Sequence, residues 1–198
     1  VLIKSSYPRL RSPRHICKAM EESVWERFVL VTMPEQAGKT FLMIKTINEQ
    51  LEGEDDKQEK VINLIFCGKT LLLAKQTATR IKRDVYLLPE TETNYVELSS
   101  RQGGTSSYKE VLLEILIHKI RNVVCCSNHA RFRDTVEIVN NLNIHGGFKF
   151  KIWLDEADQY IPTIQKMLVP LASSHANVCV YLLTATPDRI FNRYDAIN

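Results

Sequence analysis

The chain has 198 residues, of which 44% are hydrophobic and 25% are charged, which is close to the composition of an average globular domain. The length suits one well-buried domain rather than two, and the composition argues against a disordered chain or a coiled coil. The formal net charge of +3 permits an anionic partner without requiring one.

The five cysteines favour a reducing compartment. Their number is odd and no Cys-x-x-Cys pair occurs, so the sequence suggests neither a disulfide framework nor a zinc site. No apolar run approaches the roughly eighteen residues of a membrane span, and no secretory signal opens the chain. We therefore expect an intracellular protein, cytoplasmic or nuclear, with no membrane partner.

Short apolar runs alternate with longer stretches of helical spacing along the chain. The predicted strands lie at 28–33, 61–67, 84–88, 95–99, 122–127, 149–154 and 177–184. The predicted helices lie at 39–51, 70–83, 108–121, 129–142 and 159–172. Most of the predicted strands are continuous apolar runs that are rich in β-branched residues and free of proline, which is typical of strands buried on both faces. The alternation predicts an α/β fold with βαβ units around a mainly parallel sheet, in a single domain over 1–198.

The stretch VTMPEQAGKT at 31–40 follows a predicted strand and precedes a predicted helix, which is the context of a phosphate-binding loop. Backbone N–H groups of the turn and the positive end of the helix would hold phosphates. Lys39 would reach the β- and γ-phosphates, and Thr40 would bind Mg²⁺. The tripeptide Gly-Lys-Thr is weak evidence by itself, and a turn with a solvated lysine is the alternative interpretation.

The stretch KIWLDEAD at 151–158 is an apolar run that ends in Asp155, Glu156 and Asp158. Buried acids are costly unless they meet a metal or a partner. In an open α/β sheet the ligand crevice lies at the carboxyl ends of the strands, so these acids would share one edge with Lys39. Asp155 could hold Mg²⁺ mostly through water, and Glu156 could orient and deprotonate an attacking water. An acidic helix N-terminus is the alternative, and it suits Asp158 better than the whole set.

A third stretch, YLLTATPDR at 181–189, ends another predicted strand with small hydroxyl residues. Thr184 and Thr186 could hydrogen-bond to Asp158 and so link the nucleotide state to a moving domain. Taken alone, a strand cap ahead of Pro187 is the simpler interpretation.

In this order, the three stretches resemble motifs I, II and III of the first RecA-like domain of superfamily 2 helicases, the class that includes the DEAD-box proteins. The matching residues are MPEQAGKT at 33–40, LDEAD at 154–158 and TAT at 184–186. The resemblance covers essentially the whole chain. It implies a RecA-like P-loop NTPase fold, a three-layer sandwich, with ATP and Mg²⁺ as cofactors and RNA or DNA as partner.

The resemblance also implies roles for individual residues of the nucleotide site. Lys39, Asp155 and Glu156 would be catalytic, and Thr40 and Asp155 would hold Mg²⁺. The residues expected around the nucleotide are Pro34, Glu35, Gln36, Ala37, Gly38, Lys39, Thr40 and His15. Asp158, Thr184 and Thr186 would couple the nucleotide state of this site to a moving domain.

Weaker matches imply a nucleic-acid surface. GKTLLLAKQ at 68–76 resembles motif Ia, Gly103 and Gly104 resemble the family's glycine pair, and CSNHARFRD at 126–134 occupies the place of motif Ib. The residues expected to contact nucleic acid are Lys69, Thr70, Gly103, Gly104, Ser127, Asn128 and Arg131.

Three positions depart from the family pattern. Gln36 replaces the usual glycine of motif I, where a side chain narrows the space for phosphate. Leu71 stands where DEAD-box members usually have an arginine, and His15 stands where the family has a glutamine that reads adenine. The retained Lys39 and Glu156 favour a site that still hydrolyses ATP.

Members of this class bind ATP and nucleic acid between two RecA-like domains, and the second domain supplies arginines for the transition state. No stretch after Thr186 can be that domain, so we expect it in a longer chain or in another molecule. The leading interpretation is a helicase that couples ATP hydrolysis to unwinding or translocation on RNA or DNA. A non-unwinding duplex translocase and a nucleic-acid-binding module with weakened catalysis stay open. By family-level analogy, a viral origin is compatible with such a divergent domain.

Overall fold

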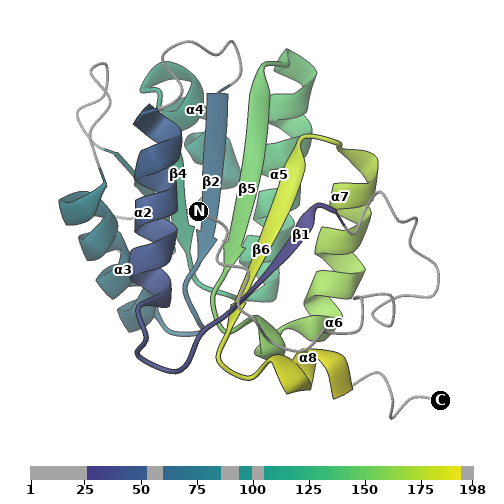
Figure 1. Cartoon of the computed structure of the whole chain (residues 1–198). Coiled ribbons are helices and arrows are strands. Elements are labelled where there is room, and N and C mark those ends of the chain that lie inside the picture. The colour runs from purple at the N-terminus through teal and green to yellow at the C-terminus, as the bar shows by residue number, and fades with distance from the viewer. Residues whose placement is uncertain (1–25, 53–59, 86–93, 100–104, 193–198) are drawn as a thin grey trace.

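The computed structural model describes residues 26–52, 60–85, 94–99 and 105–192, arranged around a parallel β-sheet (Figure 1). Within these residues the sheet has six strands in the order β1-β6-β5-β2-β4-β3, and each neighbouring pair is parallel. The strands are β1 (Phe28–Thr32), β2 (Lys60–Phe66), β3 (Val96–Leu98), β4 (Asn122–Cys125), β5 (Phe148–Leu154) and β6 (Val178–Thr184). The prediction of an α/β fold with a mainly parallel sheet is confirmed.

Helices connect the strands and cover both faces of the sheet. The longer helices are α2 (Lys39–Glu52), α3 (Leu71–Asp84), α4 (Tyr108–Ile117) and α5 (His129–His145). The shorter helices are α6 (Ile161–Thr163), α7 (Val169–Ser174) and α8 (Pro187–Asn192). Helices α2 and α3 pack on one face, and α4, α5, α6 and α7 pack on the other. This three-layer arrangement is the one expected of a RecA-like sandwich.

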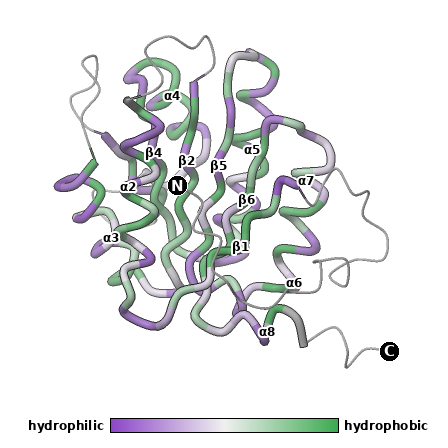
Figure 2. The backbone as a smooth tube through the Cα atoms, in the orientation of Figure 1, coloured by the Kyte–Doolittle hydropathy of each residue, from purple (hydrophilic) through white to green (hydrophobic). Residues whose placement is uncertain are grey.

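Strand β2 shows why the sheet is buried on both sides. Its residues Ile62, Leu64 and Phe66 belong to the core on the α4–α5 side, whereas Ile65 belongs to the core on the α2–α3 side. Successive side chains of a strand point to opposite faces, so a continuous apolar run supplies both cores. Figure 2 shows hydrophobic residues along interior strands such as β2 and β6.

Polar caps fix the starts of three helices. The side chains of Thr70, Ser107 and Asn128 each accept a hydrogen bond from a backbone N–H in the first turn of α3, α4 and α5. Such caps satisfy N–H groups that have no partner within the helix. The predicted starts of these helices therefore agree with the structure to within one residue.

The predicted helix at 108–121 is too long, because α4 ends at Ile117. Lys119 has a φ of 56°, in the left-handed region, and the N–H of Ile120 donates to the carbonyl of Glu114 at 3.2 Å. This turn redirects the chain into β4. Neither glycine nor proline marks the turn, so the sequence pattern gave no stop signal.

The predicted helix at 159–172 is divided into unlike pieces. A 3-10 turn spans Ala157–Gln159, α6 follows, and a π-helical segment spans Ile164–Leu168 before α7. The N–H of Val169 donates to the carbonyl of Ile164, five residues back. Pro170 has no N–H and crowds the preceding turn, which accounts for the wider π spacing just before it.

The predicted strand at 84–88 is wrong where the structure describes it. Asp84 is the last residue of α3, and the N–H of Val85 donates to the carbonyl of Ile81, at the end of the helix. Residues 86–88 lie outside the described residues. Val85 therefore closes α3 and is not part of a strand.

Two expectations from composition concern cysteines and membranes. The described cysteines Cys67, Cys125, Cys126 and Cys179 are free thiols. In the described ranges, no helix is both long enough and apolar enough to cross a membrane.

Candidate functional site

The loop between β1 and α2 lies at the carboxyl edge of the sheet. The N–H of Met33 donates to the carbonyl of Thr184 at 3.2 Å, which extends the pairing of β1 with β6. The N–H of Ala37 donates to the carbonyl of Pro34 at 3.2 Å and closes a turn. The chain then enters α2 at Lys39. The positive end of a 14-residue helix is therefore presented at this edge.

Gln36 adopts a backbone conformation that favours glycine. Its φ is 59°, and Gly38 nearby has a φ of 92°. A non-glycine residue in this left-handed region costs on the order of 1–3 kcal/mol. The side chain of Gln36 is exposed. The loop thus keeps a glycine-like path at the position where the resemblance expects glycine, at the cost of strain.

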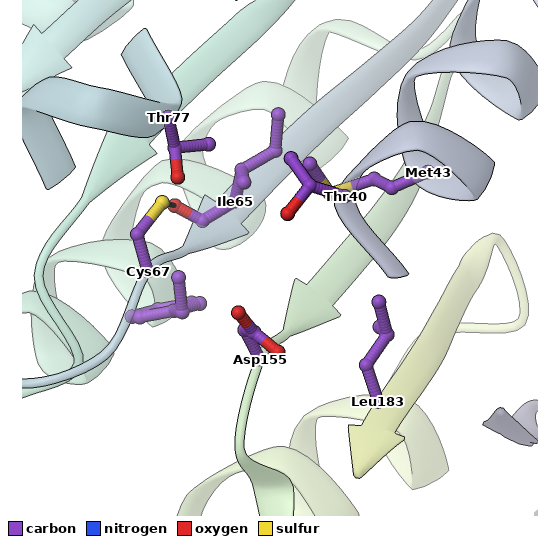
Figure 3. Close-up of a pocket in the computed structure, with 8 residues that line it drawn as sticks. Thr40, Met43, Ile65, Cys67, Thr77, Asp155 and Leu183 are labelled. Atoms are coloured by element: carbon purple, nitrogen blue, oxygen red, sulfur yellow. Dashed lines mark hydrogen bonds between the residues drawn. The ribbon is translucent and has the colours of Figure 1, made fainter. Parts of the chain in front are cut away.

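A pocket opens between the start of α2 and the carboxyl ends of β2, β5 and β6. Figure 3 shows the Thr40 hydroxyl and the Asp155 carboxyl directed into the same space, although they lie 115 residues apart in the chain (155 − 40). The other lining residues include Met43, Cys67, Thr77 and Leu183. The two side chains expected to hold Mg²⁺ therefore meet at one pocket.

Asp155 lies in an environment that opposes its negative charge. Burial raises the pKa of the Asp155 carboxyl, while the backbone N–H of Glu156 and the charge of Lys39 act against that rise. The N–H of Glu156 donates to Asp155 Oδ1 at 3.0 Å. The N–H of Asp155 itself donates to the carbonyl of Phe66 at 3.1 Å, which fixes the residue beside the end of β2. A bound cation would favour the charged form of this carboxyl.

Glu156 lies at the surface of the same edge with a φ of 53°, in the left-handed region. Its Oε2 accepts a hydrogen bond from Gln159 Nε2 at 2.7 Å. Backbone strain of this kind persists only where the surrounding structure enforces it. The turn Ala157–Gln159 supplies that constraint, because the N–H of Gln159 donates to the carbonyl of Glu156.

Asp158 is joined to the end of β6. Thr184 is fully buried, and its Oγ1 donates to Asp158 Oδ1 at 2.7 Å. The N–H of Thr186 in turn donates to Thr184 Oγ1 at 3.0 Å. The hydrogen bond expected between the second and third stretches is therefore present, and its role in coupling stays a prediction.

The residues expected to contact nucleic acid have different surroundings. Lys69 is exposed, and its Nζ lies 5.6 Å from the centroid of the Tyr160 ring. Thr70 and Asn128 are exposed helix caps whose side-chain oxygens already accept hydrogen bonds, and Ser127 is buried. Their loops follow β2 and β4, so they border the same edge as the pocket.

Arg131 is held within the protein. Its Nη1 lies 2.7 Å from Asp134 Oδ2 and donates to the carbonyl of Ser106 at 3.1 Å. Only 13% of its side chain is exposed. A guanidinium in such a pair has little freedom to reach a phosphate, so its predicted contact with nucleic acid receives no support from the geometry. His15, Gly103 and Gly104 lie outside the described residues.

Sequence reasoning missed three residues of this region. Cys67 and Thr77 line the pocket beside Asp155, and Tyr160 packs under Lys69. Cys67 directly follows β2, so its place at the carboxyl edge was available from the pattern of strands. The place of Tyr160 was not, because it depends on how the turn after Glu156 folds back.

No protein-family model matches the chain, and no curated protein matches its sequence. Among solved structures, the chain is similar to a nuclease-deletion mutant of the Type ISP restriction-modification enzyme LlaGI in complex with a DNA substrate mimic. The sequence identity is 22% and the TM-score is 0.47. The match covers 80% of this chain and 15% of that chain, so this chain spans a small part of that enzyme's length.

Proposed function

We propose that the chain is the ATP-binding domain of a nucleic-acid helicase, which couples ATP hydrolysis to unwinding or translocation on RNA or DNA. The observation that carries this proposal is the convergence of Thr40 and Asp155 on one pocket at the carboxyl edge, with the charge of Lys39 acting on Asp155. A loop-to-helix turn and an acidic strand end that share a pocket are the two halves of a nucleotide site.

The start of α2 suits the phosphates of a nucleotide. The first N–H groups of a helix have no partner within it and carry a partial positive charge. Lys39 adds a full charge at the same end of the helix. In the proposed site, these groups bind the phosphate oxygens, and Lys39 stabilises the charge that develops on the transferred phosphoryl group.

The oxygen donors of the pocket fit Mg²⁺. This ion prefers oxygen ligands, keeps several waters, and is usually held by one or two carboxylates together with substrate phosphates. Thr40 and Asp155 would supply one hydroxyl and one carboxylate. Over the described part of the chain, no group of three or more His, Cys, Asp or Glu could form a metal cage by itself, which agrees with an ion shared with a nucleotide.

Glu156 is the proposed general base. It follows Asp155 directly, and its carboxylate lies exposed at the edge of the sheet. A carboxylate there can accept the proton of an attacking water. The hydrogen bond from Gln159 Nε2 engages Oε2 of Glu156, and the other carboxylate oxygen can accept the proton while that bond is kept. Lys69 and the loop after β4 would place the nucleic acid along the same edge.

A second candidate is a nucleic-acid-binding module with weakened catalysis. The observation that favours it is the strained backbone of Gln36, which puts a side chain on the loop where the resemblance expects none. Nucleotide binding separates the two candidates, because the module would bind nucleic acid without binding Mg·ATP.

The first test is the affinity of the chain for a non-hydrolysable Mg·ATP analogue, measured by calorimetry. Lys39→Ala should lower this affinity about 10- to 100-fold, the loss expected from a charge-assisted phosphate contact. Lys45→Ala is the matched control, because Lys45 lies on the same helix with 58% of its side chain exposed. Equal affinities of the wild type and Lys39→Ala would contradict the proposed site.

A further inference from the structure

Tyr160 lies where three loops of the carboxyl edge meet. It follows the turn after β5, its ring lies under Lys69 from the loop after β2, and its hydroxyl neighbours Ser127 from the loop after β4. The ring also packs against Phe132 of α5, with centroids 6.0 Å apart. Only 6% of Tyr160 is exposed. A single side chain thus touches both loops that are expected to meet nucleic acid.

The backbone of Tyr160 continues directly from the proposed general base. The N–H of Tyr160 donates to the carbonyl of Ala157 at 3.0 Å and closes the turn that begins at Glu156. The carbonyl of Tyr160 accepts from the N–H groups of Thr163 and Ile164, both at 2.9 Å. A displacement of Tyr160 therefore moves the turn that sets the left-handed backbone of Glu156.

The hydroxyl of Tyr160 is not firmly anchored. Neither the Tyr160 hydroxyl nor the Ser127 hydroxyl has a hydrogen-bond partner with good geometry among the described residues, although both are buried. Burial raises the pKa of the Tyr160 phenol, and the nearby Ser127 hydroxyl opposes the rise. Burial without a formed hydrogen bond is costly for both hydroxyls, so neither adds much to the fixed position of the Tyr160 ring.

The Lys69 ammonium has two alternative partners. In the structure it lies over the Tyr160 ring, but it is exposed and free to turn toward a phosphate in the adjoining solvent. A cation–π contact at an exposed site is weak, and a phosphate contact is charge-assisted. Nucleic acid would therefore draw Lys69 from the ring and remove one of the contacts that hold Tyr160.

We infer that Tyr160 is a positioning residue that transmits the contact of Lys69 with a nucleic-acid phosphate to the turn that carries Glu156. The inference rests on the proposed function, and it names the path by which nucleic acid alters the nucleotide site. The aromatic ring carries the effect, because the ring is what Lys69 and Phe132 contact.

The test is the coupling between two ligands of the full chain. The affinity for a non-hydrolysable Mg·ATP analogue is measured without and with a saturating single-stranded oligonucleotide, as RNA and as DNA. In the wild type the oligonucleotide should change this affinity by about fivefold or more. Tyr160→Leu should reduce the factor to less than about twofold, whereas Tyr160→Phe should keep it, because the ring remains.

Lys69→Gln provides a second route to the same answer at a surface residue, should Tyr160→Leu fail to fold. At saturating oligonucleotide its coupling factor should also fall below about twofold. Lys82→Gln is the matched control, since Lys82 is an exposed lysine in the last turn of the adjoining helix α3. A merely structural role of Tyr160 would lower the melting temperature of Tyr160→Leu without changing the coupling.

Two results would overturn the inference while leaving the proposed function in place. One is a wild-type chain that binds both ligands without coupling, and the other is a folded Tyr160→Leu variant that keeps the wild-type factor. Failure to bind either ligand would overturn the proposed function itself, and the inference with it.

Discussion

Asp155 shows at the scale of one residue how a functional site conflicts with stability. Its carboxyl is partly buried at the end of β5, and burial raises its pKa. Burial disfavours the charged form in the folded state. Ionisation of Asp155 therefore destabilises the fold, and this cost is complete above the folded-state pKa. The cost disappears as the pH falls through the folded-state pKa toward the unfolded value, near 3.9 for an aspartate.

Asp155→Asn should therefore raise the melting temperature at pH 7 while removing Mg²⁺-dependent nucleotide binding. The gain in melting temperature should shrink as the pH falls through the folded-state pKa of Asp155, because the wild-type carboxyl then becomes protonated as well. Thermal denaturation across this pH range measures the effect. A gain that stays constant with pH, or a loss of stability at pH 7, would contradict the assigned environment.

Thr184 makes the opposite case, since its side chain contributes to stability. Thr184→Val keeps the shape of the side chain and removes both the 2.7 Å hydrogen bond to the buried Asp158 and the oxygen that accepts the N–H of Thr186. A hydrogen bond contributes about 1 kcal/mol, and up to about 3 kcal/mol when its acceptor is charged, so the free energy of unfolding should fall by about 1–3 kcal/mol. Chemical denaturation gives the value. Thr186→Val, at a partly exposed position whose N–H is retained, should cost clearly less.

At the scale of elements, the loop between β1 and α2 combines a glycine-like path with a side chain. Gln36→Gly relieves the strain at a φ of 59° but increases the entropy of the unfolded chain, so stability should stay unchanged or rise by up to about 2 kcal/mol. The affinity for Mg·ATP should rise, because space for phosphate is gained.

Glu35→Gly is the control for that experiment. Glu35 is adjacent in the same loop and is not among the described residues with a positive φ, so glycine relieves no strain there. Calorimetric titration of both variants compares the two positions. If Gln36→Gly binds Mg·ATP no better than Glu35→Gly, the side chain of Gln36 does not limit the site.

The elements that the sequence predicted well are those with a strong local signal. Helix α5 begins directly after the cap Asn128, and β5 and β6 are apolar runs whose predicted bounds differ from the structure by one residue. The errors occurred where local pattern and tertiary packing disagree. Lys119 turns the chain without a glycine, and Pro170 widens a helix turn without ending the helix.

Part of the site could also be predicted from the sequence, because parallel strands bring their carboxyl ends to one edge. That rule places Lys39 and Asp155 together without knowledge of side-chain packing. The rule does not tell which lysine and arginine side chains at this edge are free to contact nucleic acid. Only the packing shows that Arg131 is paired with Asp134 and that Lys69 lies over Tyr160.

At the scale of the whole molecule, the strand order assembles the site. Because β6 lies between β1 and β5, Thr184 reaches both the loop before α2 and the turn after β5. β2 and β4 continue the same edge toward Lys69 and Ser127. Apolar periodicity predicts strands but not their order in the sheet. Which loops are neighbours along the carboxyl edge is therefore known only from the structure. It puts the pocket and the proposed nucleic-acid surface side by side.

The most direct measurement is ATP turnover by the longest chain that carries this domain, without and with single-stranded RNA or DNA. Turnover should rise when nucleic acid is added, vanish in Lys39→Ala and Glu156→Gln, and persist in Lys45→Ala. The better stimulant would identify the nucleic acid on which the protein acts. Turnover that survives Lys39→Ala, or a chain that binds nucleic acid but neither binds nor hydrolyses Mg·ATP, would contradict an ATP-dependent function for this domain.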